Sequence, residues 1–250
     1  MKHVDIVNPN AASRLVLICE HASCFIPPQY NDLGLEPMAQ TSHAAWDPGA
    51  LPVAKHLAKL LDAVLIAGTV SRLVYDCNRP SDAPGAMPAH SEVFEIPGNV
   101  DISDQERQAR TENYYEPFRR AVAQRIAKID NPIIVTIHSF SPVYHGQTRA
   151  VEIGVLYDAD TRLADALMDV VALHSISNIQ RNQPYGPEDG VTHTLKEHAL
   201  KNNHLNVMLE IRNDLIETPD DQEYYAKMIA GWITGALTAL GHGEGGKCTA

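Results

Sequence analysis

Three apolar segments of this sequence lead into side chains that can bind a metal ion or carry a proton. The first is followed by Glu20 and His21, the second ends at His138, and the third carries Glu210. If these segments are strands of a mostly parallel sheet, their C-terminal ends lie at one edge, where such sheets bind ligands. We therefore expect these four side chains to meet at one site.

Asp47, which stands at the start of a predicted helix, could join His21 and His138 at that site. Two histidines and a carboxylate are a common zinc set for hydrolysis, because they leave one coordination position open for water. Glu210 could then act as the general base on that water. Other interpretations are open: a strand-end histidine is more often solvated or hydrogen-bonded, Asp47 before a proline can be a helix cap, and Glu210 can pair with Arg212.

A second polar cluster lies in the segment SRLVYDCNRP, residues 71–80. Arg72 or Arg79 could bind a substrate carboxylate, because the guanidinium fork matches a carboxylate with two hydrogen bonds. Asn78 could hydrogen-bond to the same group. Asp76 could instead pair with either arginine and hold the loop. We expect Asp76 to be structural and at least one arginine to bind substrate.

Apolar runs alternate with helical patterns along the chain, which indicates an α/β sheet with helices on both faces and one domain over residues 1–250. The predicted strands cover 14–19, 63–67, 72–76, 132–137, 150–156 and 206–211. The predicted helices begin near Asp47 and then cover 104–128, 161–174, 192–200 and 220–240. Two irregular segments, 79–103 and 182–191, separate them, and glycines from about residue 241 mark a frayed tail.

The composition excludes several classes of function. The chain has 250 residues and a formal net charge of -11, which disfavours nucleic acid and anionic membranes as partners. Its four cysteines form no CxxC pair, and no apolar stretch approaches the roughly 20 residues that span a bilayer. Since the first ten residues also lack the apolar core of a signal peptide, we expect a cytoplasmic protein.

Taken together, several motifs make this sequence similar to the N-formylglutamate amidohydrolase family. They are Glu20-His21-Ala22-Ser23, Asp47 before a helix, SRLVYDCNRP, the strand ending in His138-Ser139, Asn182-Gln183-Pro184-Tyr185-Gly186, and LEIRNDL at 209–215. Their order and spacing match from about residue 14 to 216, and the likeness is stronger to a less characterised branch of the family. Many members have a glycine pair after the Pro-Tyr motif, whereas this chain continues Gly186-Pro187-Glu188, so the pocket and the substrate can differ.

The resemblance implies a three-layer α/β/α sandwich with a mostly parallel mixed sheet, like that of zinc exopeptidases and peptidoglycan amidases. It implies zinc, or another divalent metal, on His21, Asp47 and His138, with Glu210 as the catalytic base. Glu20 is the alternative carboxylate ligand, although a neighbour of His21 on a strand would point the opposite way. The remaining residues expected to contact substrate are Arg72, Asn78, Arg79, Ser139, Tyr185, His193 and Arg212.

The implied reaction is hydrolysis of the N-acyl bond of a small anionic amino-acid derivative, such as N-formyl-L-glutamate, to formate and the free amino acid. In this scheme Arg72 or Asn78 helps to stabilise the oxyanion, and Arg79 and Arg212 bind substrate carboxylates. His193 could instead be an N-terminal helix residue behind a Thr192 cap.

Two other functions are compatible with the same motifs. One is a peptidoglycan or peptide amidase, which would call for an export signal. The other is a catalytically silent binding protein, which would have lost a ligand or the base. The sequence does not distinguish a monomer from a homodimer.

Overall fold

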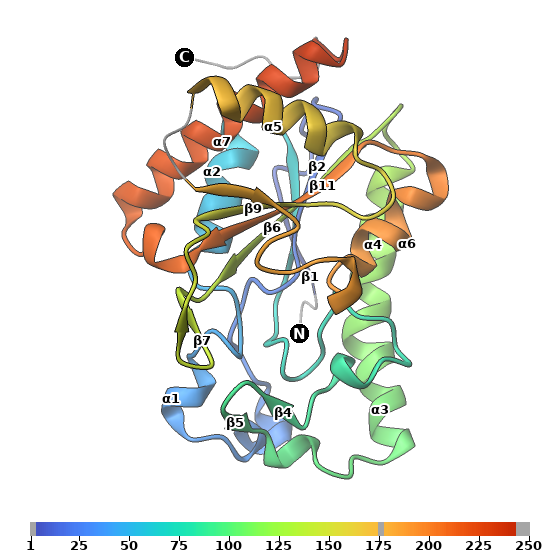
Figure 1. Cartoon of the computed structure of the whole chain (residues 1–250). Coiled ribbons are helices and arrows are strands. Elements are labelled where there is room, and N and C mark those ends of the chain that lie inside the picture. Colours follow the sequence, from blue (N-terminus) through green and yellow to red (C-terminus); the bar gives the residue numbers. More distant parts are fainter. Residues whose placement is uncertain (1–3, 175–177, 244–250) are drawn as a thin grey trace.

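The structure, a computed structural model, describes residues 4–174 and 178–243. A seven-stranded sheet crosses the molecule in the order β1-β3-β2-β6-β11-β9-β10 (Figure 1). Its strands are β1 (Val4–Val7), β2 (Leu15–Cys19), β3 (Val64–Gly68), β6 (Ile133–Phe140), β9 (Ile153–Leu156), β10 (Ile179–Arg181) and β11 (Asn206–Arg212).

The four central strands β3, β2, β6 and β11 run parallel to one another, while β1 pairs antiparallel with β3 and β9 pairs antiparallel with β11. β10 is parallel to β9. The sheet is therefore mixed but mostly parallel, as the sequence predicts. The C-terminal ends of the four central strands lie at one edge, and the residues that follow them face the same side of the molecule.

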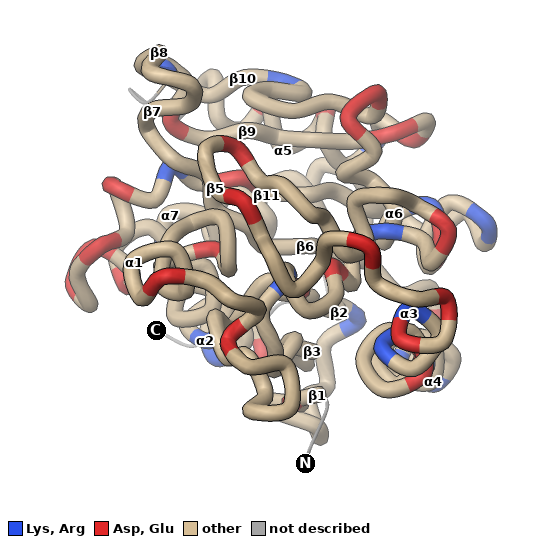
Figure 2. Tube along the Cα trace, turned by 90° about the horizontal axis from the view of Figure 1, so that it is seen from below, with Lys and Arg blue, Asp and Glu red and all other residues tan. Residues whose placement is uncertain are grey.

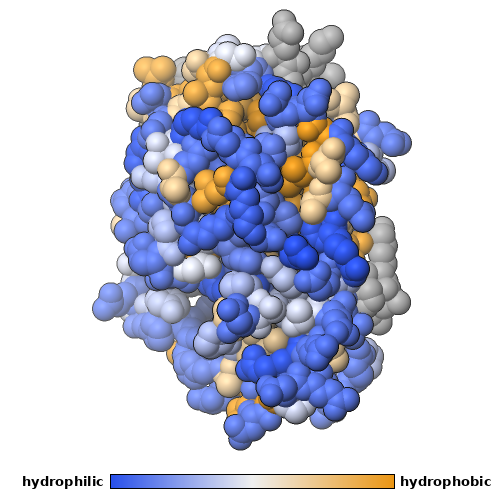
Figure 3. Space-filling view, turned by 90° about the vertical axis from the view of Figure 1, so that its right-hand side faces the viewer, coloured by the Kyte–Doolittle hydropathy of each residue, from blue (hydrophilic) through white to orange (hydrophobic). Residues whose placement is uncertain are grey.

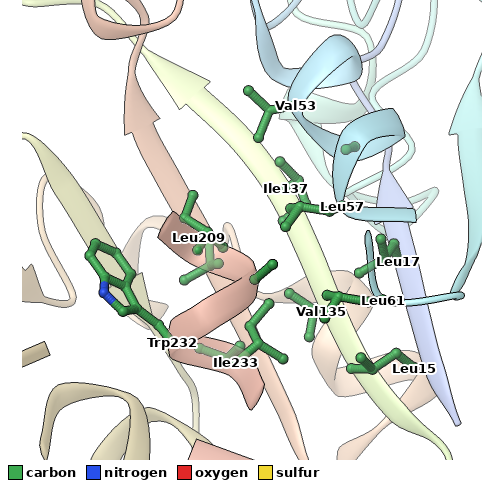
Figure 4. Close-up of a cluster of buried hydrophobic side chains, with 14 of the residues drawn as sticks. Leu15, Leu17, Val53, Leu57, Leu61, Val135, Ile137, Leu209, Trp232 and Ile233 are labelled. Atoms are coloured by element: carbon green, nitrogen blue, oxygen red, sulfur yellow. The ribbon is translucent and has the colours of Figure 1, made fainter. Parts of the chain in front are cut away.

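Three helices cover one face of the sheet: α2 (Ala50–Leu60), α5 (Arg162–His174) and α7 (Pro219–Ala239) (Figure 1). Their apolar side chains meet those of β2, β6 and β11. Figure 4 shows this layer, in which Leu57 lies near Ile137, Leu61 lies between Leu17 and Val135, and Ile233 lies on the other side of Val135. α7 begins at a well-formed cap, because the Thr218 hydroxyl accepts a hydrogen bond from the Asp221 N–H (3.2 Å).

The other face is covered by α4 (Glu116–Ile126) and α6 (His193–His198), while α3 (Asp104–Arg110) precedes α4 and extends beyond the sheet (Figure 1). A π turn at Thr111–Tyr115 joins α3 to α4, so the single predicted helix over 104–128 is interrupted. Pro117 lacks the N–H that a regular α-helix would use at this point, which accounts for the irregular turn. Seen from this side, the surface is largely hydrophilic, with hydrophobic side chains in small separate groups (Figure 3).

Successive side chains of a buried strand point to opposite faces of the sheet, so each strand packs against both helical layers. In β2, Leu15 and Leu17 join the cluster under α2 and α7, whereas Val16 and Ile18 join the cluster under α4. Because both faces of this strand are covered, its sequence is a continuous apolar run. The fold thus has the three layers of an α/β sandwich.

The predicted strand at 72–76 is wrong. The segment is buried, but it folds into turns: the Ser71 carbonyl accepts hydrogen bonds from Val74 N–H (2.9 Å) and Tyr75 N–H (3.3 Å), and the Ser71 hydroxyl accepts from Leu73 N–H (3.1 Å). A short apolar run does not reveal whether its backbone bonds locally or to another strand, and here the serine favours the local bonds. The helix expected from Asp47 begins only at Ala50.

Loops and short elements form a cap at the C-terminal edge of the central strands, in the lower part of Figure 1. These elements are α1 (Pro37–Gln40), the hairpin of β4 (His90–Ser91) and β5 (Phe94–Glu95), and the hairpin of β7 (Val143–Tyr144) and β8 (Gln147–Thr148). Short 3₁₀ segments lie at Pro28–Gly34, Pro84–Ala86, Pro97–Asn99, Pro187–Asp189, Leu200–Asn202 and Asn213–Leu215.

Acidic residues are spread over the surface of this cap when it is viewed from below (Figure 2). None of the helices in the described ranges is long and apolar enough to cross a membrane. The tail expected from about residue 241 lies outside the described residues from position 244 onward.

Candidate metal centre and active site

Three buried side chains from separate elements converge at the sheet edge. His21 follows β2, Asp47 lies in the loop before α2, and His138 lies near the end of β6. Asp47 Oδ2 is 3.3 Å from His21 Nδ1 and 2.9 Å from His138 Nδ1. One ligand atom from each residue lies within 4.8 Å of the other two, and each residue is at most 3% exposed. In the described part of the chain, this is the one group of three or more such side chains that could hold a metal ion.

The backbone before α2 is shaped so that Asp47 reaches this point. Gly49 has a positive φ of 79°, and a Cβ at this residue would lie 2.5 Å from the Ile216 carbonyl oxygen. Only glycine fits such a conformation at such a close approach. The Ser139 hydroxyl donates to the Pro48 carbonyl (2.7 Å), and Ser139 N–H donates to Asp47 Oδ2 (3.3 Å). Asp47 is thus held against β6 rather than used as a helix cap.

Two further carboxylates face the far nitrogens of the two imidazoles. Asp76 Oδ1 is 2.7 Å from His21 Nε2, and Glu20 Oε2 is 3.2 Å from His138 Nε2. Carboxylates in this position commonly orient histidines that bind metals, because they hold the proton on the outer nitrogen. With the proton on each outer nitrogen, each Nδ1 would offer a lone pair beside Asp47, and three electron-pair donors would converge on one point.

The charges around this point attract a cation. Burial alone would lower the pKa of His138, but Glu20 and Asp47 raise it well above its ordinary value, so the cluster favours positive charge at this ring. Arg72 offsets part of the negative charge through contacts with Asp76 (2.8 Å) and Asp47 (3.6 Å). The donor set, its burial and its charge therefore fit a divalent metal ion.

Glu210 lies beside the three donors. It is the partner of His138 in the register between β11 and β6, so the two side chains share one face of the sheet. Glu210 is 5% exposed, and its Oε2 has no hydrogen-bond partner among the described residues. Burial, with a smaller contribution from Asp47, raises the pKa of Glu210 to about 7. A carboxylate with such a pKa is suited to take up and release a proton near neutral pH.

A pocket with a volume of about 290 Å³ opens onto this centre. His21, Asp47, His138 and Glu210 lie in its wall. The rest of the wall comes from the loop that contains Arg72, from the ends of β6 and β7, and from the cap. Its residues are His43, Ala44, Arg72, Asn78, Arg79, Ser91, Glu92, Ser139, Phe140, Ser141, Tyr144, Tyr185, Asp189 and Val191.

Comparison with known proteins assigns this chain to a family. The model of the N-formylglutamate amidohydrolase family matches residues 13–217. This chain belongs to that family. Membership of this family supports an amide hydrolase function.

The solved structures that resemble the chain include the following two. A gene product of Agrobacterium tumefaciens is 48% identical, with a TM-score of 0.94 over 96% of this chain and 97% of that one. The N-formylglutamate amidohydrolase of Ralstonia eutropha is 16% identical, with a TM-score of 0.55 over 93% of this chain and 98% of that one, which shows a shared fold. No protein with a curated description matches the sequence.

The residues that the family resemblance indicated as substrate contacts fall into two groups, those that line the pocket and those that do not. Asn78 lines the pocket, but its side chain ties two loops together: Nδ2 donates to the Val191 carbonyl (2.5 Å), and Oδ1 accepts from Thr194 N–H (3.0 Å). Arg79 donates to the carbonyls of Gly190 (2.7 Å), Asn78 (3.0 Å) and Asp189 (3.4 Å). Tyr185 and Ser139 also line the pocket.

Two of these residues do not line it. His193 Nε2 lies 2.7 Å from the Tyr115 hydroxyl at the start of α6, and burial lowers the pKa of His193. Arg212 donates to both carboxylate oxygens of Asp214 (2.8 and 3.2 Å) and to the Arg149 carbonyl (3.1 Å). The pair that the sequence left open between Glu210 and Arg212 is not formed, because the Arg212 guanidinium binds Asp214 and the Arg149 carbonyl instead.

The structure shows contacts of four residues near the centre that the sequence did not predict. Asp76 does pair with an arginine, as expected, but it also contacts a candidate ligand histidine. Glu20, considered only as a ligand, lies behind His138 instead. At the rim, His43 Nε2 contacts Glu92 Oε2 (2.5 Å) across loops 49 positions apart, and no sequence pattern signals such a contact.

Proposed function

We propose that this chain is a metal-dependent amidohydrolase that removes the acyl group from a small N-acyl amino acid bearing a carboxylate, with N-formyl-L-glutamate as the first substrate to test. The observation that carries the proposal is the convergence of His21, Asp47 and His138 beside Glu210, which lines the pocket and whose Oε2 has no hydrogen-bond partner among the described residues. Zinc is the expected metal, because two imidazoles and a carboxylate suit it.

A metal ion bound by these residues would polarise the acyl carbonyl and make a water molecule more acidic. Glu210 supplies the proton transfers. It takes a proton from the attacking water and later delivers it to the nitrogen of the departing amine. A pKa of about 7 serves both steps, because the same group must accept a proton and then give it up.

Arg79 is the best-placed cation for the substrate carboxylate. Its guanidinium lines the pocket and contacts backbone carbonyls, and none of the carboxylates in the described ranges forms an ion pair with it. The charge of Arg72, in contrast, is already offset by Asp76 and Asp47. A pocket of about 290 Å³ suits a small molecule.

The test is a hydrolysis screen of N-formyl, N-acetyl and N-carbamoyl derivatives of glutamate, aspartate, glutamine and alanine, with released amine measured before and after chelation. We expect hydrolysis of N-formyl-L-glutamate that chelator removes and zinc restores. Glu210→Gln should retain the metal and lose about 10²- to 10⁴-fold in rate. Glu197→Gln, which changes a glutamate outside the pocket, is the matched control.

Two outcomes contradict the proposal. Activity that survives complete removal of metal would exclude the metal centre from the reaction. A zinc-loaded protein that hydrolyses no member of the screen would indicate a binding protein that has kept the fold.

A further inference from the structure

Arg149, a residue that no sequence motif singled out, is enclosed by aromatic rings at the edge of the pocket. It follows β8, and its guanidinium carbon lies 4.4 Å from the ring centre of Tyr144, 4.9 Å from that of Tyr185 and 5.6 Å from that of Phe140. All three rings belong to residues that line the pocket. Stacking of this kind holds a guanidinium in place while leaving its N–H groups free to donate.

One of those N–H groups is directed at a phenol. Arg149 Nη1 donates to the Tyr185 hydroxyl oxygen (3.1 Å) and also lies 3.4 Å from the Ser141 carbonyl. Because the Tyr185 oxygen accepts from Arg149, its own hydrogen must point elsewhere. In the described part of the chain, that hydrogen meets no protein acceptor.

Tyr185 and Glu210 line the same pocket and are close enough to interact electrostatically. The phenol hydrogen is therefore available to a ligand that occupies the space between them. Burial, with the charge of Glu210, raises the pKa of Tyr185, so this group keeps its proton at neutral pH.

Three other polar side chains of the pocket wall already have protein partners. Both polar atoms of the Asn78 amide bind backbone groups, and the Ser139 hydroxyl donates to Pro48. The guanidinium of Arg72 faces two carboxylates. Because their polar groups already have protein partners, Arg72 and Asn78 are poorer candidates to stabilise the oxyanion than the sequence suggested.

We propose that the Tyr185 hydroxyl donates a hydrogen bond to the acyl oxygen of the substrate, and that Arg149 is the positioning residue that turns this hydroxyl toward it. The inference rests on the proposed amidohydrolase activity. When water oxygen bonds to the acyl carbon, the π-electron pair moves onto the acyl oxygen, and the Tyr185 O–H stabilises the charge that develops there.

When the intermediate collapses, the electron pair returns, the C–N bond breaks and the nitrogen takes a proton from Glu210. Tyr185 retains its proton throughout. Arg149 contributes twice in this arrangement: it fixes the rotation of the hydroxyl, and its positive charge makes the O–H a stronger donor.

The test is a double-mutant cycle of Tyr185→Phe and Arg149→Met, with kcat and KM measured on the best substrate of the screen. Tyr185→Phe keeps the ring that stacks on Arg149 and removes only the hydroxyl. We expect it to lower kcat by about 100-fold with KM changed less than about threefold, as for loss of one oxyanion donor. Arg149→Met should lower kcat by about tenfold alone and by less than about twofold when combined with Tyr185→Phe, because its effect passes through that hydroxyl.

Arg149→Lys is the conservative variant, and it guards against a loss of folding. It retains the charge and the aliphatic stem, so it should recover part of the activity that Arg149→Met loses. A merely structural role in holding the β7–β8 hairpin would instead give equal losses in kcat with and without the Tyr185 hydroxyl. Such additive losses, or an unchanged kcat in Tyr185→Phe, would overturn the proposal.

The wild-type screen and the Glu210→Gln variant test the proposed function independently of the double-mutant cycle. If the wild-type protein hydrolyses nothing in the screen, the amidohydrolase proposal fails and this inference fails with it. If the wild type is active and Glu210→Gln is not, the reaction stands, and the cycle alone decides the role of Tyr185 and Arg149.

Discussion

Replacing Asp76 with asparagine tests whether the carboxylates behind the two histidines control metal affinity. Asp76 Oδ1 accepts from His21 Nε2 (2.7 Å) and from Asn78 N–H (2.9 Å), while its Oδ2 accepts from Arg72 (2.8 Å). In Asp76→Asn the amide oxygen can keep the first two contacts, but the amide nitrogen then faces the Arg72 N–H groups, donor against donor. Arg72 is left with Asp47, a candidate metal ligand 3.6 Å away.

This loss of charge should weaken metal binding without removing a ligand. Although burial alone would raise it, His21 and Arg72 hold the pKa of Asp76 well below its ordinary value, so the residue is a full negative charge in the native protein. Loss of such an outer carboxylate typically costs about 10- to 100-fold in metal affinity, or about 1.4–2.7 kcal/mol. Because Asp76 lies only 2.7 Å from His21 Nε2, we expect Asp76→Asn to lose about 100-fold in metal affinity.

Glu20→Gln provides an internal comparison. Glu20 lies 3.2 Å from His138 Nε2 without the alignment of a hydrogen bond, so its replacement should cost about 10-fold, near the lower limit. Glu92→Gln changes a carboxylate that contacts His43, an imidazole outside the donor set, and should leave metal affinity unchanged.

The measurement is zinc affinity of metal-free protein, obtained by competition with a chromogenic chelator at constant pH. Circular dichroism of each metal-free variant establishes that the fold is retained. The reasoning is refuted if Asp76→Asn binds zinc within about threefold of the wild type. It is equally refuted if Glu92→Gln loses as much affinity as Asp76→Asn.

Three further predictions concern binding, stability and pH. Arg79→Gln should raise KM for a carboxylate-bearing substrate by about 10- to 100-fold with little change in kcat, and an unchanged KM would exclude Arg79 as the carboxylate site. Gly49→Ala should lower the free energy of unfolding by about 2 kcal/mol or more, because its Cβ would meet the Ile216 carbonyl at 2.5 Å; urea unfolding measures this, and wild-type stability in the variant would contradict it. Burial lowers the pKa of His198 to about 4. The neutral form of His198 therefore stabilises the fold above its ordinary pKa of about 6.5, and this contribution should fall by about 2 kcal/mol between pH 7 and pH 5. Urea unfolding at the two pH values should show a smaller loss of stability in His198→Gln, and an equal loss would contradict the prediction.

The main strands and helices follow from the sequence because their apolar patterns are long and regular. The predicted helix at 161–174 corresponds to Arg162–His174, and the predicted strand at 206–211 to Asn206–Arg212. The four-residue β1 lies at the sheet edge and has too few residues for a pattern to emerge. The strand prediction for 72–76 failed for a different reason. The side chains of this segment are buried like those of a strand, but its backbone hydrogen bonds are local.

The candidate centre was predictable where residue type and strand position coincide. His138 and Glu210 lie on neighbouring strands, and parallel pairing brings them together once the sheet is assumed. The contact between Asp76 and His21 depends on how a loop turns, and that turn is set by bonds between distant segments, such as Arg72 N–H to the Ala45 carbonyl (3.1 Å). Sequence patterns do not record contacts of that kind.

The pairing of Glu210 with His138 in the ladder between β11 and β6 has a consequence for how such a protein diversifies. Neighbouring strands are spaced about 4.8 Å apart by their main-chain bonds, so the offset between the Glu210 carboxylate and the His138 imidazole is inherited from backbone geometry. The cap loops contribute nothing to that offset. Insertions or exchanges among them can change which molecule fits the pocket, while Glu210 and His138 stay in register.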